Sequence, residues 1–330
     1  MSKIIPAPLR PGDEIRVVAP ARGLKLIGED SFNQALERFR TWGLKVSFAT
    51  HTTRENWDRF GSSSIEDRVS DLHEAFAAPE VKGIFTVIGG TNSNQLLPFL
   101  DYDLIRANPK VFCGFSDITA LLNGIYAQTG LVTFSGPHFS SFGMRLGFDY
   151  TLAAAQNMLS GPRDLTVEPS SQWSDDLWFI DQDKREFIAN EGYWLLQDGK
   201  ATGTVIGGNL GTFDLLLGSP YRPAFPSDTI LFVEDCATAG AADLGYFERQ
   251  LQALLYQPDF SHVKGVVIGR FQKASEVNRD ALAAIIASKP QLKNLPVLAN
   301  VDFGHTTPML TLPIGGHAEL DGCRLRLSLA

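Results

Sequence analysis

Ser116 is the residue whose setting points most directly to chemistry. It follows a short apolar run that ends at Gly114, and an apolar-periodic run that predicts a helix comes after it. A serine at a sharp turn between a strand and a helix presents its hydroxyl to solvent, and the N–H groups at the helix start can stabilise an oxyanion. The pattern therefore predicts a hydrolase nucleophile. It also fits a serine that only caps the helix, because Ile118 replaces the second glycine of a Gly-x-Ser-x-Gly turn and serine is a preferred N-cap.

A serine nucleophile needs a general base, and histidine is the usual one because its pKa lies near neutrality. Of the six histidines, His305 has the most suitable setting, in a turn that follows Gly304 and a predicted strand. A carboxylate would be needed to orient its imidazole. Glu234 ends an apolar run and is our candidate, while its neighbour Asp235 is an alternative that the sequence decides against only weakly.

Residue spacing gives no support for a metal or a cofactor, and we expect neither. The pair Asp302 and His305 is too small a set for a metal site, and no Gly-x-Gly-x-x-Gly follows a predicted strand. The cysteines Cys113, Cys236 and Cys323 are odd in number and form no CxxC pair, which favours a reducing cytoplasm. Cys113 as the nucleophile of an amidotransferase-like enzyme is disfavoured, because it lies inside an apolar run where a thiol is inert.

The length and composition indicate a globular protein with more than one core. The chain has 330 residues, 44% of them hydrophobic and 20% charged, and this length favours two domains. Its net charge is −8 and it contains no run of lysine and arginine, so a nucleic acid polymer is not expected as a partner. No apolar run approaches the length of a membrane span or a signal peptide. We therefore expect no membrane partner and a cytoplasmic protein.

The first half of the chain alternates strand and helix patterns. Strands are predicted over 15–19, 45–48 and 83–88, with amphipathic helices between them. This alternation is typical of an α/β protein with an open parallel sheet of the Rossmann or flavodoxin kind. Ligands of such sheets bind beyond the carboxyl ends of the strands. The glycine-rich segment 89–94 and the Ser116 turn both follow such ends, where glycines can aim N–H groups at a ligand. Gly89–Gly90 fits an oxyanion site and an ordinary tight turn equally well.

The rest of the chain predicts a second domain. We expect an N-terminal domain over 1–165, a linker or long aromatic loop over 166–200, and a smaller C-terminal α/β domain over 201–330. The last of these should close with a β-hairpin near 311–327. The middle segment holds three of the five tryptophans. Long loops with their own aromatic residues are often functional lids, although these rings could equally pack the loop onto the domain.

Six segments, taken in order, resemble the LD-carboxypeptidase (muramoyltetrapeptide carboxypeptidase) family of serine peptidases over nearly the whole chain. They are Pro11–Pro20, Gly89–Asn94, Gly114–Asp117, Gly207–Leu210, Val233–Asp235 and Phe303–His305. The resemblance implies a triad of Ser116 as nucleophile, Glu234 as orienting carboxylate and His305 as general base. It also implies an oxyanion hole formed by the N–H groups of Gly90 and Asp117, and a homodimer.

Within this family, the aromatic insert looks closer to the microcin C self-immunity branch. Those enzymes hydrolyse the amide-type bond between a peptidyl or aminoacyl group and a nucleotide, and an aromatic side chain stacks on the nucleobase. We therefore expect a small peptide or aminoacyl-nucleotide substrate. The alternatives are release of the terminal D-alanine from a murein tetrapeptide, and a non-catalytic α/β protein that only binds a ligand.

The substrate-binding residues that we expect are Gly89, Thr91, Asn92, Trp178, Tyr193, Trp194 and Asn209. The sequence does not decide which aromatic side chain stacks on the substrate, and Trp173 is a further candidate. It also leaves open whether Arg22 or Arg270 binds a substrate carboxylate, a role that suits the bidentate guanidinium group.

Overall fold

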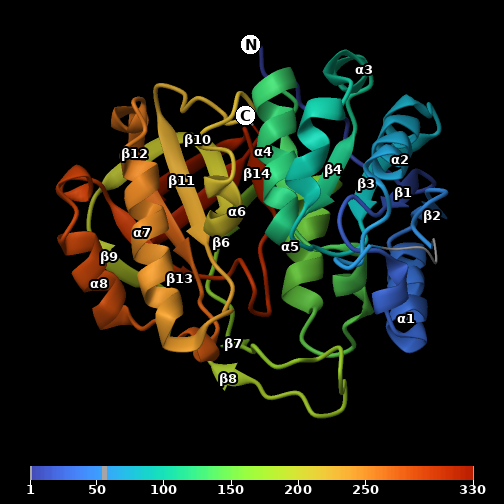
Figure 1. Cartoon of the computed structure of the whole chain (residues 1–330). Coiled ribbons are helices and arrows are strands. Elements are labelled where there is room, and N and C mark those ends of the chain that lie inside the picture. The colour runs from blue at the N-terminus through green and yellow to red at the C-terminus, as the bar shows by residue number, and fades with distance from the viewer. Residues whose placement is uncertain (1, 54–57, 330) are drawn as a thin grey trace.

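The computed structural model describes residues 2–53 and 58–329. It contains a six-stranded sheet and an eight-stranded sheet, which lie side by side with helices packed around them (Figure 1). The first sheet is built mainly from the N-terminal half and the second from the C-terminal half. The predicted α/β fold with two sheet domains is confirmed.

The first sheet has the strand order β14-β5-β4-β3-β1-β2, and all its neighbours are parallel except β14 and β5. Its strands are β1 (Glu14–Val18), β2 (Lys45–Phe48), β3 (Val81–Thr86), β4 (Val111–Gly114), β5 (Thr133–Ser135) and β14 (Leu312–Ile314). Every residue of β4 is buried, as expected for a parallel strand covered on both faces. The order 2-1-3-4-5 is that of flavodoxin-like sheets.

The helices of this domain lie on both faces of the sheet. They are α1 (Glu29–Thr41), α2 (Ile65–Ala77), α3 (Tyr102–Ala107), α4 (Thr119–Thr129) and α5 (Asp149–Leu159). The predicted cap of α2 is confirmed, because the Ser64 side chain accepts a hydrogen bond from the Asp67 N–H. From β1 the chain moves outward to the edge strand β2, and from β2 it returns past β1 to β3. Right-handed crossovers therefore put α1 and α2 on opposite faces, which opens a crevice between the carboxyl ends of β1 and β3.

The second sheet has the order β6-β16-β15-β10-β11-β12-β13-β9 and a parallel centre, β10 to β13. Its strands are β6 (Asp164–Val167), β9 (Trp194–Gln197), β10 (Lys200–Asn209), β11 (Thr229–Glu234), β12 (Val263–Gly269), β13 (Val297–Val301), β15 (His317–Asp321) and β16 (Arg324–Ser328). Its helices are α6 (Leu210–Asp214), α7 (Asp243–Leu255) and α8 (Arg279–Ala287). The predicted C-terminal hairpin is confirmed as β15 and β16.

The segment 166–200 is more ordered than the loop that we expected. Strand β6, which begins just before this segment, pairs with β16, and β9 pairs with β13. The two strands are therefore the edges of the second sheet. Between them, β7 (Gln172–Trp173) and β8 (Ile188–Ala189) form a small ribbon. Strands β6 and β9 cover the hydrogen-bonding groups that β16 and β13 would otherwise expose. The expected domain boundary at residue 165 falls inside β6, and β14 crosses back to the first sheet.

The two sheets share one apolar core. Along β11, Ile230 and Phe232 belong to the cluster that contains the first sheet, whereas Leu231 and Val233 pack on the opposite side with α7 and α8. This alternation follows from the two-residue period of a strand. The shared core fixes the position of one sheet relative to the other.

Helix α4 makes direct polar contacts with β10 of the second sheet. The Asn123 side chain donates to the Gly207 carbonyl over 2.8 Å, and the Thr119 hydroxyl accepts from the Asn209 N–H over 3.0 Å. A Cβ atom at Gly208 would lie 2.6 Å from the Thr119 hydroxyl oxygen. The Gly207–Gly208 pair therefore lets α4 pack directly on β10, and this contact brings the Ser116 turn beside the second sheet.

Candidate active site

Ser116 lies at the turn that the sequence predicts, immediately after β4. Its φ of +60° is uncommon for a residue with a side chain, and such strain gathers at functional turns. The hydroxyl caps no helix, because Phe115 occupies the N-cap position of the short 3₁₀ turn Ser116–Ile118. Instead, Ser116 Oγ lies 2.9 Å from His305 Nε2.

The other nitrogen of His305 contacts a carboxylate. His305 Nδ1 lies 2.8 Å from Glu234 Oε2, and Glu234 is almost fully buried at the end of β11. Asp235 instead accepts hydrogen bonds from the Asn209 side chain and from the Cys236 N–H. Between the two acidic residues that the sequence left open, the one that contacts His305 is therefore Glu234.

The pKa values of the two histidines near Ser116 are shifted in opposite directions. Burial lowers the pKa of His305, but the Glu234 carboxylate opposes this strongly enough to leave the pKa above its ordinary value. His138 is buried without an acidic partner, and burial lowers its pKa to about 3. Its Nδ1 lies 2.6 Å from the Thr86 hydroxyl, and its Nε2 has no hydrogen-bond partner among the described residues. Of these two histidines, His305 is the one that lies within hydrogen-bonding distance of the serine hydroxyl.

The segment after β3 and the Ser116 turn after β4 lie side by side. The Asp117 carboxylate, which is buried, accepts hydrogen bonds from the N–H groups of Asn92 and Ser93. A Cβ atom at Gly89 would lie only 3.1 Å from the Ser116 Cβ. The segment after β3 is therefore tied against the Ser116 turn, which holds Gly90 beside it. The Asp117 N–H lies in the first turn of a helical segment, where N–H groups have no partner within the helix.

A cavity of about 320 Å³ opens over Ser116 and His305. Gly89, Gly90 and Arg22 line its first-domain side, and Trp178 lies in the wall formed by the aromatic segment. Its size is at the lower end for small-molecule sites. Of the four candidate aromatic residues, Trp178 is the one that lines the cavity.

The other expected aromatic residues have partners outside the cavity. The Arg270 guanidinium lies over the Trp173 ring at 5.3 Å. The Tyr193 hydroxyl donates to Asp302 over 3.5 Å, and Trp194 Nε1 donates to Glu191 over 2.7 Å. These contacts favour structural roles for the three side chains.

Three further expected binding residues also lie away from the cavity lining. Thr91 is exposed. The Asn92 side chain is buried and accepts hydrogen bonds from Ser62 and Arg68. Asn209 caps α6, because its side chain accepts from the Thr212 N–H. The structure therefore brings only Gly89 and Trp178 of the seven expected binding residues to the cavity wall.

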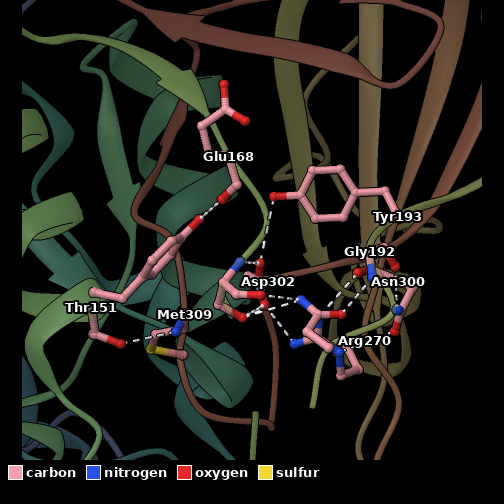
Figure 2. Close-up of polar contacts among 11 residues, drawn as sticks. Thr151, Glu168, Gly192, Tyr193, Arg270, Asn300, Asp302 and Met309 are labelled. Atoms are coloured by element: carbon pink, nitrogen blue, oxygen red, sulfur yellow. Dashed lines mark hydrogen bonds and ion pairs between the residues drawn. The ribbon is translucent and has the colours of Figure 1, made fainter. Parts of the chain in front are cut away.

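A buried polar network supports the turn that carries His305 (Figure 2). Arg270 Nη1 lies 2.5 Å from Asp302 Oδ1, and both side chains are almost fully buried. Arg270 Nε donates to the Asn300 side chain, and Ser170 donates to Asp302 through both its N–H and its hydroxyl. The network joins β12, the turn after β13 and the start of the aromatic segment. Because its guanidinium is already paired, Arg270 is not available to bind a substrate carboxylate.

Sequence reasoning did not single out His138 or the Arg270–Asp302 pair. His138 follows β5 in a Gly-Pro-His sequence that has no distinctive spacing to Ser116. Cys113 lies in β4, just before the Ser116 turn, and is fully buried. Burial raises the pKa of its thiol far above its ordinary value. A buried neutral thiol is a poor nucleophile.

Residues 2–53 and 58–329 contain neither a membrane-spanning helix nor a metal-binding cluster. None of the helices there is both long and apolar enough to cross a membrane. No three histidine, cysteine, aspartate or glutamate side chains gather there in a group that could hold a metal ion.

Comparison with known proteins identifies the family. The family model of the LD-carboxypeptidase N-terminal domain matches residues 15–136, and that of the C-terminal domain matches residues 202–320. The chain is 48% identical to YocD of Bacillus subtilis (strain 168), which carries a carboxypeptidase assignment, over 95% of this chain and 94% of that protein. It is 34% identical to the microcin C7 self-immunity protein MccF of Escherichia coli, over 96% and 93% of the two chains.

Solved structures agree with the sequence matches. An MccF-like protein from Bacillus anthracis str. Ames superposes with a TM-score of 0.96 at 49% identity, over 99% of this chain and 100% of that one. MccF in complex with glutamyl sulfamoyl guanosine superposes with a TM-score of 0.86 at 32% identity, over 98% of both chains. The two domain models and the relatives agree with the Ser116–His305–Glu234 geometry. The chain therefore belongs to the LD-carboxypeptidase family of serine peptidases.

Proposed function

We propose that this protein hydrolyses an amide-type bond at a peptidyl or aminoacyl carboxyl group through the triad Ser116, His305 and Glu234. The observation that carries the proposal is the hydrogen-bonded chain from the Ser116 hydroxyl through His305 to Glu234 at the cavity. A nucleophile, a base and an orienting carboxylate in this order are the parts that acyl transfer to serine needs.

In the proposed mechanism, His305 Nε2 takes the Ser116 proton as Oγ attacks the scissile carbonyl carbon. The N–H groups of Gly90 and Asp117 donate to the oxyanion of the tetrahedral intermediate. His305 then gives the proton to the leaving nitrogen, and water hydrolyses the acyl-serine with His305 again as the base. Glu234 keeps the His305 tautomer that points an unprotonated Nε2 at the serine, and it stabilises the imidazolium.

For the substrate, we propose an aminoacyl- or peptidyl-nucleotide of the microcin C kind. The relative MccF has been solved with glutamyl sulfamoyl guanosine and with aspartyl sulfamoyl adenosine. Support from this chain comes from Trp178, an indole ring in the cavity wall that could stack on a nucleobase. The alternative is a murein tetrapeptide that loses its terminal D-alanine. The homodimer and the cytoplasmic location remain predictions.

The two substrates are separated by mass spectrometry of reaction mixtures. The wild-type protein and Ser116→Ala are each incubated with a murein tetrapeptide and, separately, with an aminoacyl-sulfamoyl adenosine. We expect cleavage of the nucleotide compound that depends on Ser116. Cleavage of the tetrapeptide alone would instead assign the murein reaction, and cleavage of neither would contradict the proposed function.

A further inference from the structure

Arg22 lies at the cavity next to the proposed oxyanion hole. It follows the carboxyl end of β1, and its N–H donates to the Gly89 carbonyl over 3.4 Å. A Cβ atom at Gly90 would lie 3.5 Å from Arg22 Cγ, so the aliphatic part of the arginine runs against Gly90. Arg22 and Ser116 line the same cavity.

Among the residues that the structure describes, none compensates the charge of Arg22. Among residues 2–53 and 58–329, its guanidinium has no ion pair and no hydrogen-bond acceptor. The two acidic residues that line the cavity are each paired with another cation. Asp176 accepts two hydrogen bonds of 2.8 Å from Arg185 Nε, and Asp175 lies 3.3 Å from Lys273 Nζ.

The backbone position of Arg22 is one where ligands of this fold class bind. Arg22 follows β1 and Gly89 follows β3, and these neighbouring strands flank the point where the strand order reverses. The chain leaves the two strands towards opposite faces of the sheet, so the crevice between their carboxyl ends is open to a ligand. A guanidinium in such a crevice suits carboxylate, sulfonyl or phosphoryl oxygens.

We propose that Arg22 binds the anionic group attached to the leaving nitrogen of the substrate and so determines specificity. This inference rests on the proposed function. A peptide with a free carboxyl end places its carboxylate one carbon from the leaving nitrogen, and an acyl sulfamate or acyl phosphoramidate places its anion directly on that nitrogen. The same side chain would serve each, because the shared chemistry is an oxyanion next to the scissile bond.

The experiment measures binding in the Ser116→Ala background, so that it does not depend on turnover. Dissociation constants are compared for a tetrapeptide with a free carboxyl end, for its carboxamide analogue and for an aminoacyl-sulfamoyl adenosine. Adding Arg22→Gln should weaken binding of at least one anionic ligand about tenfold or more, as for a lost charge-assisted hydrogen bond. The carboxamide should be unaffected. The anionic ligand whose binding is weakened by Arg22→Gln identifies which anion Arg22 binds.

Two further variants sharpen the comparison. Arg22→Lys should recover part of the lost affinity, because it restores the charge without the bidentate geometry. Lys25→Gln removes one charge from an exposed side chain three residues away and should leave all three constants unchanged. Equal loss for the carboxylate and the carboxamide, or no loss for any ligand, would overturn the role of Arg22. Loss of Ser116-dependent hydrolysis is a separate readout and concerns the proposed function alone.

Discussion

Ser116 Oγ lies 2.9 Å from His305 Nε2, although 189 positions separate the two residues in the chain. The contact joins two sheets, because Ser116 follows β4 of the first and His305 follows β13 of the second. Packing of α4 on the Gly207–Gly208 segment of β10 holds the two strand ends at this distance. The candidate site therefore depends on the interface between the sheets as much as on either sheet.

Glu234→Gln should move the acidic limb of the pH profile of kcat/KM to lower pH. Glu234 raises the pKa of His305, and the base must be neutral to act, so the wild-type limb should lie above the ordinary histidine value of about 6.5. Without the carboxylate, burial of the ring favours its neutral form at lower pH. The plateau should also fall, because the imidazolium loses its partner.

Asp235→Asn is the matched control for this prediction. Asp235 lies beside Glu234 and also raises the pKa of His305, but less than Glu234 does. It should therefore shift the limb less than Glu234→Gln does. An equal shift in the two variants would contradict a specific pairing of His305 with Glu234.

The Glu234–His305 pair should also affect stability in a defined pH range. Because the folded-state pKa of His305 is raised, the pair contributes its full stabilisation below the unfolded-state pKa. That stabilisation is lost as the pH rises through the folded-state pKa. Urea denaturation of the wild type and Glu234→Gln at several pH values measures it, and a difference that grew with rising pH would contradict the assignment.

Trp178→Ala should raise KM for an aminoacyl-sulfamoyl adenosine and leave a peptide that lacks the nucleobase nearly unaffected. Stacking on an aromatic ring contributes about 1–3 kcal/mol per base, which corresponds to a change of roughly 5- to 150-fold. Trp194→Phe, at a ring that hydrogen-bonds Glu191 away from the cavity lining, is the control and should change neither KM. If the peptide and the nucleotide lost affinity equally, Trp178 would be a packing residue rather than a nucleobase platform.

Much of this arrangement could be predicted from the sequence. The strands that precede Ser116 and Glu234 are buried apolar runs, which carry a strong local signal, and the motif matches identify His305. The edge strands β6 and β9 could not be predicted, because each has only four residues and is flanked by glycines, prolines or serines that are typical of loops. Asp302 and Arg270 could not be paired either, because an ion pair between distant segments leaves no local pattern.

Asp302→Asn should destabilise the protein strongly. It would leave the Arg270 guanidinium buried without an anionic partner, and breaking a buried ion pair costs about 3–5 kcal/mol. Asp183→Asn is the control, because Asp183 pairs with Arg145 at an exposed site, where such pairs contribute roughly 0–1 kcal/mol. Urea denaturation of both variants measures the difference, and equal losses would contradict a structural role for the Arg270–Asp302 network.

The most direct test of the central claim is mass spectrometry after reaction with a serine-directed phosphonate. We predict one covalent adduct per chain, located on the peptide that contains Ser116 and absent from Ser116→Ala. That variant should be inactive yet melt within a few degrees of the wild type, because a serine at a turn buries little surface. An adduct on another residue, or hydrolysis that persists in Ser116→Ala, would contradict the serine mechanism.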